Sequence, residues 1–317
     1  VTLTQQLLAC DEGNRAPTFS EMLHPFGEHG EFVQASSEAD CRLAPAQVAM
    51  DLMFGSNDYL NRLGPRKADM AFDDSMILQN SLRDSFLATQ FDAPEYESWL
   101  SDNSGSEAQE GYAFHKTFLQ HLQWQHGCEH KRWLLASTDH VGHLDDILAT
   151  YPDAKVIFAH RDGSETVAGR CQEVLSLRRG LMSVDASKVA ERELHQMATN
   201  AKAAADFRRR NPHLKAQFAD VTLSDLLKNP VDRVKRLYRK LNLSPLSRRS
   251  SQAMWRMVLA NRSRLSAIKS VPASIGDFAL DEEDQRFDAL TKASIKGKSC
   301  SKARRSMNVG CAPSFRR

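Results

Sequence analysis

The sequence has no long hydrophobic run. No apolar stretch approaches the roughly 20 residues that a helix needs to cross a membrane. The first residues also lack the basic segment and apolar core of a secretory signal, but the chain opens on Val1 rather than Met. The sequence therefore does not decide whether a targeting segment precedes Val1. The location is unknown from the sequence, and the cytoplasm is the favoured expectation.

Disulfide and metal-binding patterns are also missing. The six cysteines are scattered and form no C-x-x-C pair, which argues against a zinc ribbon or a compact disulfide framework and suits a reducing compartment. Four histidines, at positions 115, 121, 126 and 130, follow one another at spacings of 6, 5 and 4 residues and do not keep to one helical face. We expect no metal site.

Acidic residues are absent from the end of the chain. Residues 291–317 hold eight of the 42 Lys and Arg but none of the 40 Asp and Glu, so residues 1–290 carry a net negative charge. This asymmetry predicts a folded domain over 1–290 and a basic, disordered tail over 291–317. Contact of the tail with an acidic surface is the weaker alternative, and the acidic body gives no reason to expect nucleic-acid binding.

The second half of the sequence does contain a regular alternation of apolar strands and helices. Strands are expected at 132–137, 155–159 and 215–221, with helices at 140–150, 164–179, 187–210 and from Pro230 onward. The preceding part is mostly helical, with helices expected at 2–10, 45–64, 73–92 and 112–127. Strands that alternate with helices predict an α/β fold in which helices flank a parallel sheet.

The stretch YPDAKVIFAHRDGSETVAG, residues 151–169, places Arg161 directly after an apolar strand. Ser164 is expected to cap the helix that follows. Open α/β sheets bind ligands at the carboxyl ends of their strands, and a helix start beside a guanidinium suits an anion. The alternative is that Arg161 pairs with Asp162 or with an acid on the surface.

Three segments carry a family resemblance by their order: RWLLASTDHVGHLDDILATYPDAKVIFAHRD, NPVDRVKRLYRKLNLSPLS and SIGDFALDEE. They resemble the sulfotransferases that use 3′-phosphoadenosine-5′-phosphosulfate (PAPS), in their bacterial-type branch and the related tyrosylprotein sulfotransferases. Residues 2–21 and 73–100 are similar to the helix that follows the family's phosphosulfate loop and to the branch's helical insert. The resemblance implies a P-loop nucleotide-binding fold with a largely helical insert. It also implies sulfuryl transfer from PAPS to a hydroxyl or amine of a small-molecule, glycan or peptide acceptor, without a metal.

The same resemblance implies roles for individual residues. Arg161 matches the arginine that binds the 3′-phosphate of PAPS, a role that suits the donors of a guanidinium. Glu21 lies where many members carry the catalytic base, and a solvated loop glutamate is the alternative. His140 matches a histidine that is frequent in the branch, and it either faces the acceptor cleft or caps the next helix.

Several positions depart from the family pattern. Thr2 matches the last threonine of a Pro-Arg-Ser-Gly-Thr-Thr loop, so the first strand and the rest of the phosphosulfate loop are expected upstream of this chain. Gly169 stands where the family has a serine that contacts the 3′-phosphate, and Ala136 stands where the branch has a lysine. These losses make a non-catalytic homologue, acting as a binding or scaffold module, the alternative function. A kinase-like transferase is disfavoured because no G-x-x-x-x-G-K-[ST] stretch is present.

Overall fold

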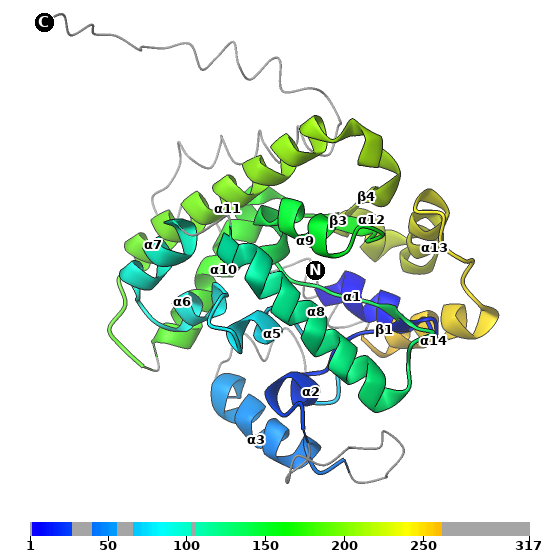
Figure 1. Ribbon diagram of the computed structural model, residues 1–317, viewed down its shortest axis with the longest axis horizontal. Coiled ribbons are helices and arrows are strands. Elements are labelled where there is room, and N and C mark those ends of the chain that lie inside the picture. The colour runs from blue at the N-terminus through cyan, green and yellow to red at the C-terminus, as the bar shows by residue number, and fades with distance from the viewer. Residues whose placement is uncertain (1, 27–39, 56–65, 103–105, 180, 262–317) are drawn as a thin grey trace, which may run out of the picture.

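The computed structural model describes residues 2–26, 40–55, 66–102, 106–179 and 181–261 (Figure 1). In chain order the elements are α1 (Thr2–Ala9), β1 (Asn14–Arg15), α2 (Phe19–Leu23), α3 (Leu43–Phe54), α5 (Ser75–Gln79), α6 (Phe86–Gln90), α7 (Pro94–Asp102), α8 (Ser106–His126), β2 (Arg132–Trp133), the 3₁₀ helix η1 (Asp139–Gly142), α9 (Leu144–Thr150), β3 (Val156–His160), α10 (Gly163–Arg178), α11 (Ala186–Arg210), η2 (Pro212–Gln217), β4 (Phe218–Thr222), α12 (Leu223–Lys228), α13 (Pro230–Lys240) and α14 (Arg248–Ala260).

The described strands form two small parallel sheets. β1 pairs with β2 over two residues, and β3 pairs with β4 over five, from Val156 opposite Phe218 to His160 opposite Thr222. A mixed helix and strand architecture with parallel pairing is thus confirmed. The strand expected at 132–137 is shorter than predicted: β2 ends at Trp133, opposite the end of the two-residue β1, and the backbone N–H of Ala136 donates to the carboxylate of Asp74 instead of to a strand.

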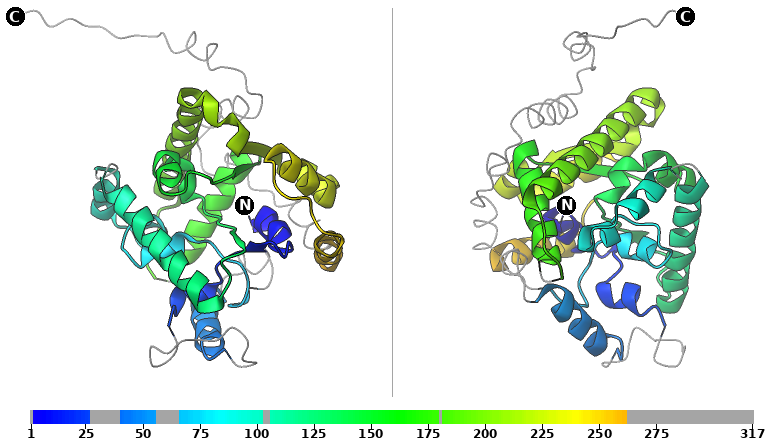
Figure 2. Two further views of the ribbon diagram at one scale, coloured as in Figure 1. Left: turned by 45° about the vertical axis from the view of Figure 1, so that its right-hand side comes forward. Right: turned by 90° about the vertical axis from the view of Figure 1, so that its left-hand side faces the viewer.

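Two large apolar clusters hold many of the helices against one another and against these strands; Figure 2 shows how the helices surround the strands. One cluster joins α1, β4, α12, α13 and α14 and contains Leu7 and Val234, whose side chains are fully buried. The other joins α2, α3, α5 and α8 around Phe19, Ile77 and Leu122, which are equally buried. The apolar stripes of the helices, rather than the short strands, therefore supply most of the core contacts.

The single helix predicted for 73–92 is wrong, because the structure has two short helices, α5 and α6. Leu82, three residues after the end of α5, adopts a left-handed backbone conformation with φ of 56°, which a continuing helix does not allow. The carboxylate of Asp84 then accepts hydrogen bonds from the N–H groups of Phe86 and Leu87 and starts α6. The apolar spacing is helical in both pieces, so periodicity alone could not reveal the break.

The cap of α10 also differs from the prediction. Asp162, rather than Ser164, occupies the N-cap, and its side chain accepts hydrogen bonds from the N–H groups of Ser164 and Glu165. A carboxylate is the better partner for a helix start because it adds charge to the hydrogen bond. α10 consequently begins at Gly163, two residues after Arg161.

Some predicted segments fall outside the described residues. The helix expected at 45–64 spans Leu43–Phe54, and positions 56–65 are not described. The segment SIGDFALDEEDQRFDAL and the basic tail at 291–317 also lie outside the described residues. Within the described part of the chain, no helix combines the length and apolar character that crossing a membrane requires.

Candidate active site

A cavity of about 860 Å³ opens at the carboxyl end of β3. Its wall is formed by the turn between α5 and α6, by parts of α8, η1, α10 and α11, and by the last residues of β3. Both arginines and carboxylates line it. Ligands of parallel α/β sheets bind outside the carboxyl ends of the strands, so this cavity is the candidate active site.

Arg161 directly follows β3 and lines this cavity. Its Nε donates to Oε2 of Glu165 over 2.6 Å, one turn into α10, and its side chain is 28% exposed. The partner is Glu165 because the carboxylate of Asp162 is turned toward the start of α10. An anion that binds Arg161 must therefore compete with Glu165 for the guanidinium.

His140 does not cap the helix that follows it, since His143 stands at the N-cap of α9. In η1, the Nε2 atom of His140 lies 2.7 Å from Oδ2 of Asp74, and its Nδ1 lies 2.9 Å from the hydroxyl oxygen of Tyr112. Tyr112 comes from α8 and lines the cavity. His140 thus reaches the cavity wall through this tyrosine.

Asp74 is a buried acceptor of three hydrogen bonds. They come from His140, from Nε2 of His115 at 3.0 Å and from the backbone N–H of Ala136. The other ring nitrogen of His115, Nδ1, lies 2.8 Å from the hydroxyl oxygen of Tyr151. Burial acts to raise the pKa of Asp74, but His140 and His115 hold that pKa well below its usual range. Burial acts to lower the pKa of His140, but the charge and hydrogen bond of Asp74, together with the charges of Asp73 and Asp139, raise that pKa overall.

The ionised state of Asp74 fixes the direction of these hydrogen bonds. An ionised carboxylate only accepts, so His140 and His115 both direct Nε2–H at Asp74. A neutral His140 then presents the lone pair of Nδ1 to Tyr112, whose hydroxyl donates to it. Asp74, His140 and Tyr112 form a chain from a buried charge to the cavity wall. The sequence showed Asp74 only as an acid before an apolar run, and it gave no signal for Tyr112.

Glu21 is buried in α2, so the interpretation as a solvated loop glutamate is wrong. Its carboxylate accepts from Nη2 of Arg15 at 2.6 Å and from the N–H of Thr18 at 3.0 Å, which completes a capping box. His126 Nε2 lies 3.0 Å away without the geometry of a hydrogen bond. Burial acts to raise the pKa of Glu21, yet His126, Arg15 and Thr18 hold it below the usual value. Glu21 does not line the 860 Å³ cavity, and its catalytic role stays a prediction.

Comparison with known proteins identifies the family and similar folds. A model of the sulfotransferase family matches residues 2–247. The chain belongs to the sulfotransferase family. The crystal structure of sulfotransferase STF1 from Mycobacterium tuberculosis is similar, with a TM-score of 0.69 and 21% identity, over 92% of this chain and 72% of that one. Sulfotransferase STF9 from Mycobacterium avium is also similar, with a TM-score of 0.70 and 17% identity, over 94% and 74% of the two chains. No curated protein matches the sequence.

Two further residues of this member of the sulfotransferase family were predicted to bind the donor. Thr2 begins α1, and Gly169 lies in α10 beside Arg170, which does line the cavity. Neither Thr2 nor Gly169 is among the described residues of the cavity wall, and their roles stay predictions. The described residues contain no group of three or more His, Cys, Asp or Glu that could hold a metal ion.

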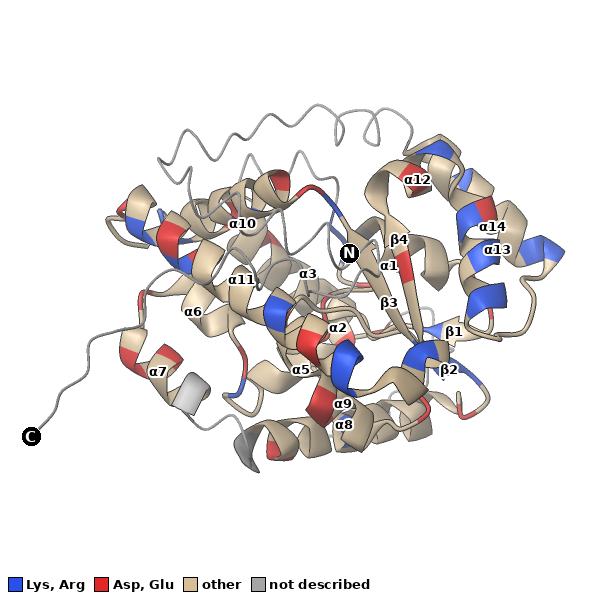
Figure 3. Ribbon diagram, turned by 90° about the horizontal axis from the view of Figure 1, so that it is seen from above, with Lys and Arg blue, Asp and Glu red and all other residues tan. Residues whose placement is uncertain are grey.

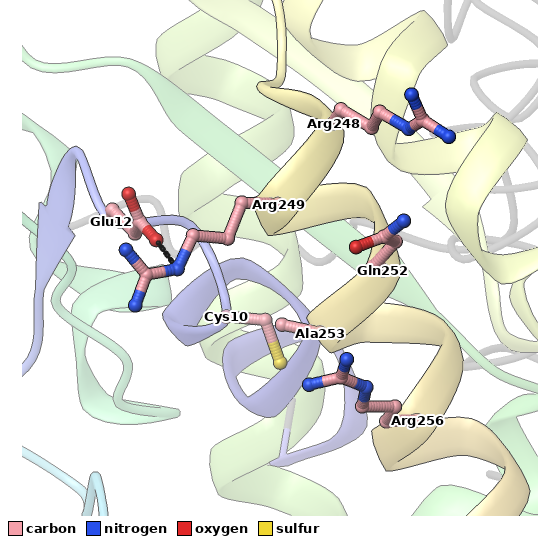
Figure 4. A pocket seen from close by; sticks show the side chains of 7 residues that line it. All are labelled: Cys10, Glu12, Arg248, Arg249, Gln252, Ala253 and Arg256. Carbon is pink, nitrogen blue, oxygen red and sulfur yellow. Dashed lines mark ion pairs between the residues drawn. The ribbon is translucent and has the colours of Figure 1, made fainter.

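A second hollow of about 740 Å³ lies between α1 and α14 (Figure 4). Arg248, Arg249 and Arg256 line it, and Nε of Arg249 pairs with Oε1 of Glu12 at 2.7 Å. The neighbouring α13 is also rich in Lys and Arg (Figure 3). The Arg249 side chain is 85% exposed, so this ion pair is a weak surface contact. The hollow shares no lining residue with the cavity at β3.

Proposed function

We propose that this protein is a PAPS-dependent sulfotransferase with a P-loop nucleotide-binding fold, and that donor and acceptor meet in the 860 Å³ cavity. One observation carries the proposal: Arg161 and Tyr112 line the same cavity. Arg161 offers a guanidinium to an anion at the carboxyl end of β3, and Tyr112 ends the chain that begins at Asp74. An anion-binding group and a proton acceptor in one wall are what sulfuryl transfer to a hydroxyl requires.

The described residues fit a phosphate-bearing donor. The Arg161 guanidinium stands where parallel strands present their ligands, and its planar fork of donors matches phosphate oxygens. In this proposal Arg161 holds the 3′-phosphate, with Thr2 and Gly169 at positions where the family also binds the donor. PAPS supplies the activated sulfuryl group.

The chain's own residues take up the proton of the acceptor. When the acceptor oxygen takes the sulfuryl group, the bond between that group and the 5′-phosphate of the donor would break and adenosine 3′,5′-bisphosphate would leave with the electron pair. The acceptor proton passes to the Tyr112 oxygen, and the Tyr112 proton passes to Nδ1 of His140. The imidazolium that forms is stabilised by the ionised Asp74 at 2.7 Å. Glu21 remains the second candidate for the base, on the family resemblance.

A non-catalytic binding module is the second candidate function, and three observations favour it. Gly169 lacks the hydroxyl of the family's serine, and Ala136 lacks the charge of its lysine. Arg161 is paired with Glu165 and gives up that contact when it binds an anion. Each of these features weakens donor binding without removing the cavity.

Calorimetry and label transfer separate these functions. We expect adenosine 3′,5′-bisphosphate to bind more tightly than adenosine 5′-monophosphate, and radiolabelled sulfuryl to move from PAPS to members of an acceptor panel. Arg161→Ala should weaken the bisphosphate by about tenfold and the monophosphate little, because one charged hydrogen-bond partner is lost. Arg210→Ala is the matched control, since Arg210 pairs with Asp145 on the surface. Bisphosphate binding without transfer to any acceptor would favour the binding module.

A further inference from the structure

Asp84 has a buried oxygen atom with no partner. The residue lies in the turn between α5 and α6, lines the cavity and is only 3% exposed. Its Oδ1 accepts from the N–H groups of Phe86 at 3.0 Å and Leu87 at 3.2 Å. Its Oδ2 is buried and has no hydrogen-bond partner among the described residues. Buried polar atoms normally have a hydrogen-bond partner, so Oδ2 is expected to take a donor from outside the described residues.

The arginines of the cavity wall are paired with other acids. The pairs are Arg83 with Glu110, Arg161 with Glu165, Arg170 with Glu173 and Glu193, and Arg192 with Glu97. Asp139 instead accepts from the hydroxyl of Ser85 at 2.6 Å and from its N–H at 3.3 Å. Neither Asp84 nor Asp139 forms an ion pair with any described Lys, Arg or His. Two carboxyl groups of one wall therefore have no ion-pair partner within the described residues, although the charge of Asp139 acts from farther away on Arg170 and His140.

The charge of Asp139 also acts on Asp84. Burial, followed by the charges of Asp139 and Asp73, raises the pKa of Asp84 to about 7. A cation between Asp84 and Asp139 would relieve this repulsion. The structural alternative is that Asp84 only starts α6. That task uses Oδ1 alone, and asparagine performs it equally well, so it explains neither the unpartnered Oδ2 nor the charge.

We propose that Asp84 and Asp139 form a subsite for the protonated amine of the acceptor, which is a small primary amine with an apolar body and a hydroxyl group. Leu78, Ala88 and Val141 of the same wall offer apolar contacts to that body. The hydroxyl lies toward Tyr112 and receives the sulfuryl group. This last part rests on the proposed function, whereas binding of the amine does not.

Tyramine and 4-propylphenol test the subsite because they are similar in size and differ in charge. At pH 8 we expect calorimetry to show that tyramine binds about tenfold more tightly, as one charged hydrogen bond implies. Asp84→Asn keeps the start of α6 and should bind both compounds equally. Asp185→Asn is the matched control, since Asp185 caps α11 in the same way outside the cavity, and it should keep the preference. Equal binding by the unmodified protein, or a preference that survives Asp84→Asn, overturns the proposal.

The preference for tyramine over 4-propylphenol should also depend on pH. Tyramine should bind more tightly as the pH rises from 6 to 8, because Asp84 loses its proton near pH 7 while the amine stays charged. The titratable or charged groups that act on Asp84 or Asp139 are Asp73 and, from α7, Tyr96, near Asp84, and Tyr112 of α8, Arg170 of α10 and His140 of η1, near Asp139. In Asp84→Asn the dependence should vanish. A dependence that remains would belong to Asp73 or His140 and would contradict the proposal.

Two further measurements distinguish a folding defect from the loss of the subsite, and the amine subsite from the proposed function. Circular dichroism checks that Asp84→Asn is folded, and if it is not, Asp139→Asn decides, because it should lower the preference for tyramine severalfold. An unchanged preference in Asp139→Asn would then overturn the subsite. Titration of the same samples with adenosine 3′,5′-bisphosphate tests the proposed function independently. A preference for tyramine without nucleotide binding contradicts the proposed function alone, and the reverse result contradicts the amine subsite alone.

Discussion

His140 and Asp74 lie 66 residues apart in the chain and are joined by a hydrogen bond of 2.7 Å between Nε2 and Oδ2. The Asp74 side chain is fully buried and accepts from His115 as well. Since Tyr112 lies 2.9 Å from the remaining nitrogen of His140, both ring nitrogens have a partner. The orientation and the proton of His140 are therefore set by residues from two other parts of the chain.

The first prediction concerns Tyr112. Tyr112→Phe removes the hydroxyl that links His140 to the cavity, so we expect turnover to fall by about 10²-fold, the typical contribution of acid–base catalysis. The affinity for adenosine 3′,5′-bisphosphate should stay unchanged. Steady-state kinetics and calorimetry measure the two effects. Tyr151→Phe is the matched control, because Tyr151 bonds to His115 in the same manner but does not line the cavity. An equal loss in both variants would show that the tyrosines serve only the packing of the histidines.

Asp74→Asn should destabilise the fold in a pH-dependent way. The pKa of Asp74 is lowered on folding, so its contribution is present above its ordinary value of 3.8 and is lost as the pH falls through the folded pKa. The pKa of His140 is raised, so its contribution is present below 6.5 and is lost as the pH rises through the folded pKa. The loss in unfolding free energy should be greatest between about pH 4 and 6.5, at about 3 kcal/mol.

Urea unfolding at several pH values measures this loss. Asp145→Asn is the control, since Asp145 forms an exposed ion pair with Arg210 and should cost at most about 0.5 kcal/mol. The same substitution at Asp74 should also lower the pKa of His140, which shifts the acid limb of the rate profile to lower pH. A loss of stability that is constant across this pH range would mean that Asp74 acts through packing and not through its charge.

Glu21→Gln separates a structural from a catalytic carboxylate. Arg15 loses its charged partner, so we expect the unfolding free energy to fall by about 1–3 kcal/mol. Turnover per folded molecule should stay within about threefold, because Glu21 lies outside the cavity wall and its lowered pKa makes it a weak base. A fall in turnover of about 10²-fold with unchanged nucleotide affinity would instead identify Glu21 as the base.

Gly169→Ser restores the hydroxyl that the family carries at this position. If the proposed donor site is right, the affinity for adenosine 3′,5′-bisphosphate should rise by about two- to tenfold, as one neutral hydrogen bond implies. Adenosine 5′-monophosphate, which lacks the 3′-phosphate, should bind as before. Gly169→Ala adds the carbon without the hydroxyl and controls for helix stability. A gain that is the same for Ser and Ala would argue against a contact with the phosphate.

Local patterns were a good guide where a segment's neighbours did not compete with them. β3 and α13 lie within one or two residues of the predicted positions, because a short apolar run and a proline at the helix start are strong local signals. The prediction failed where a side chain from elsewhere took over a backbone group. Asp74 accepts the N–H of Ala136 within the segment predicted as a strand, and Asp84 starts α6 within the segment predicted as one helix.

The sequence by itself determined the family, from motifs in order along most of the chain, and the mixed helix and strand architecture and the position of Arg161 after a strand, from local patterns. Only the tertiary structure decided which groups share a cavity. Tyr112 and Arg161 come from α8 and from the end of β3, and no local pattern relates them. It also decided the state of the buried acids: Asp74 has three donors and stays charged, whereas Asp84 has an oxygen without a partner among the described residues and a pKa raised to about 7. Burial and the charges of neighbours set these properties, and both arise only when distant segments pack together.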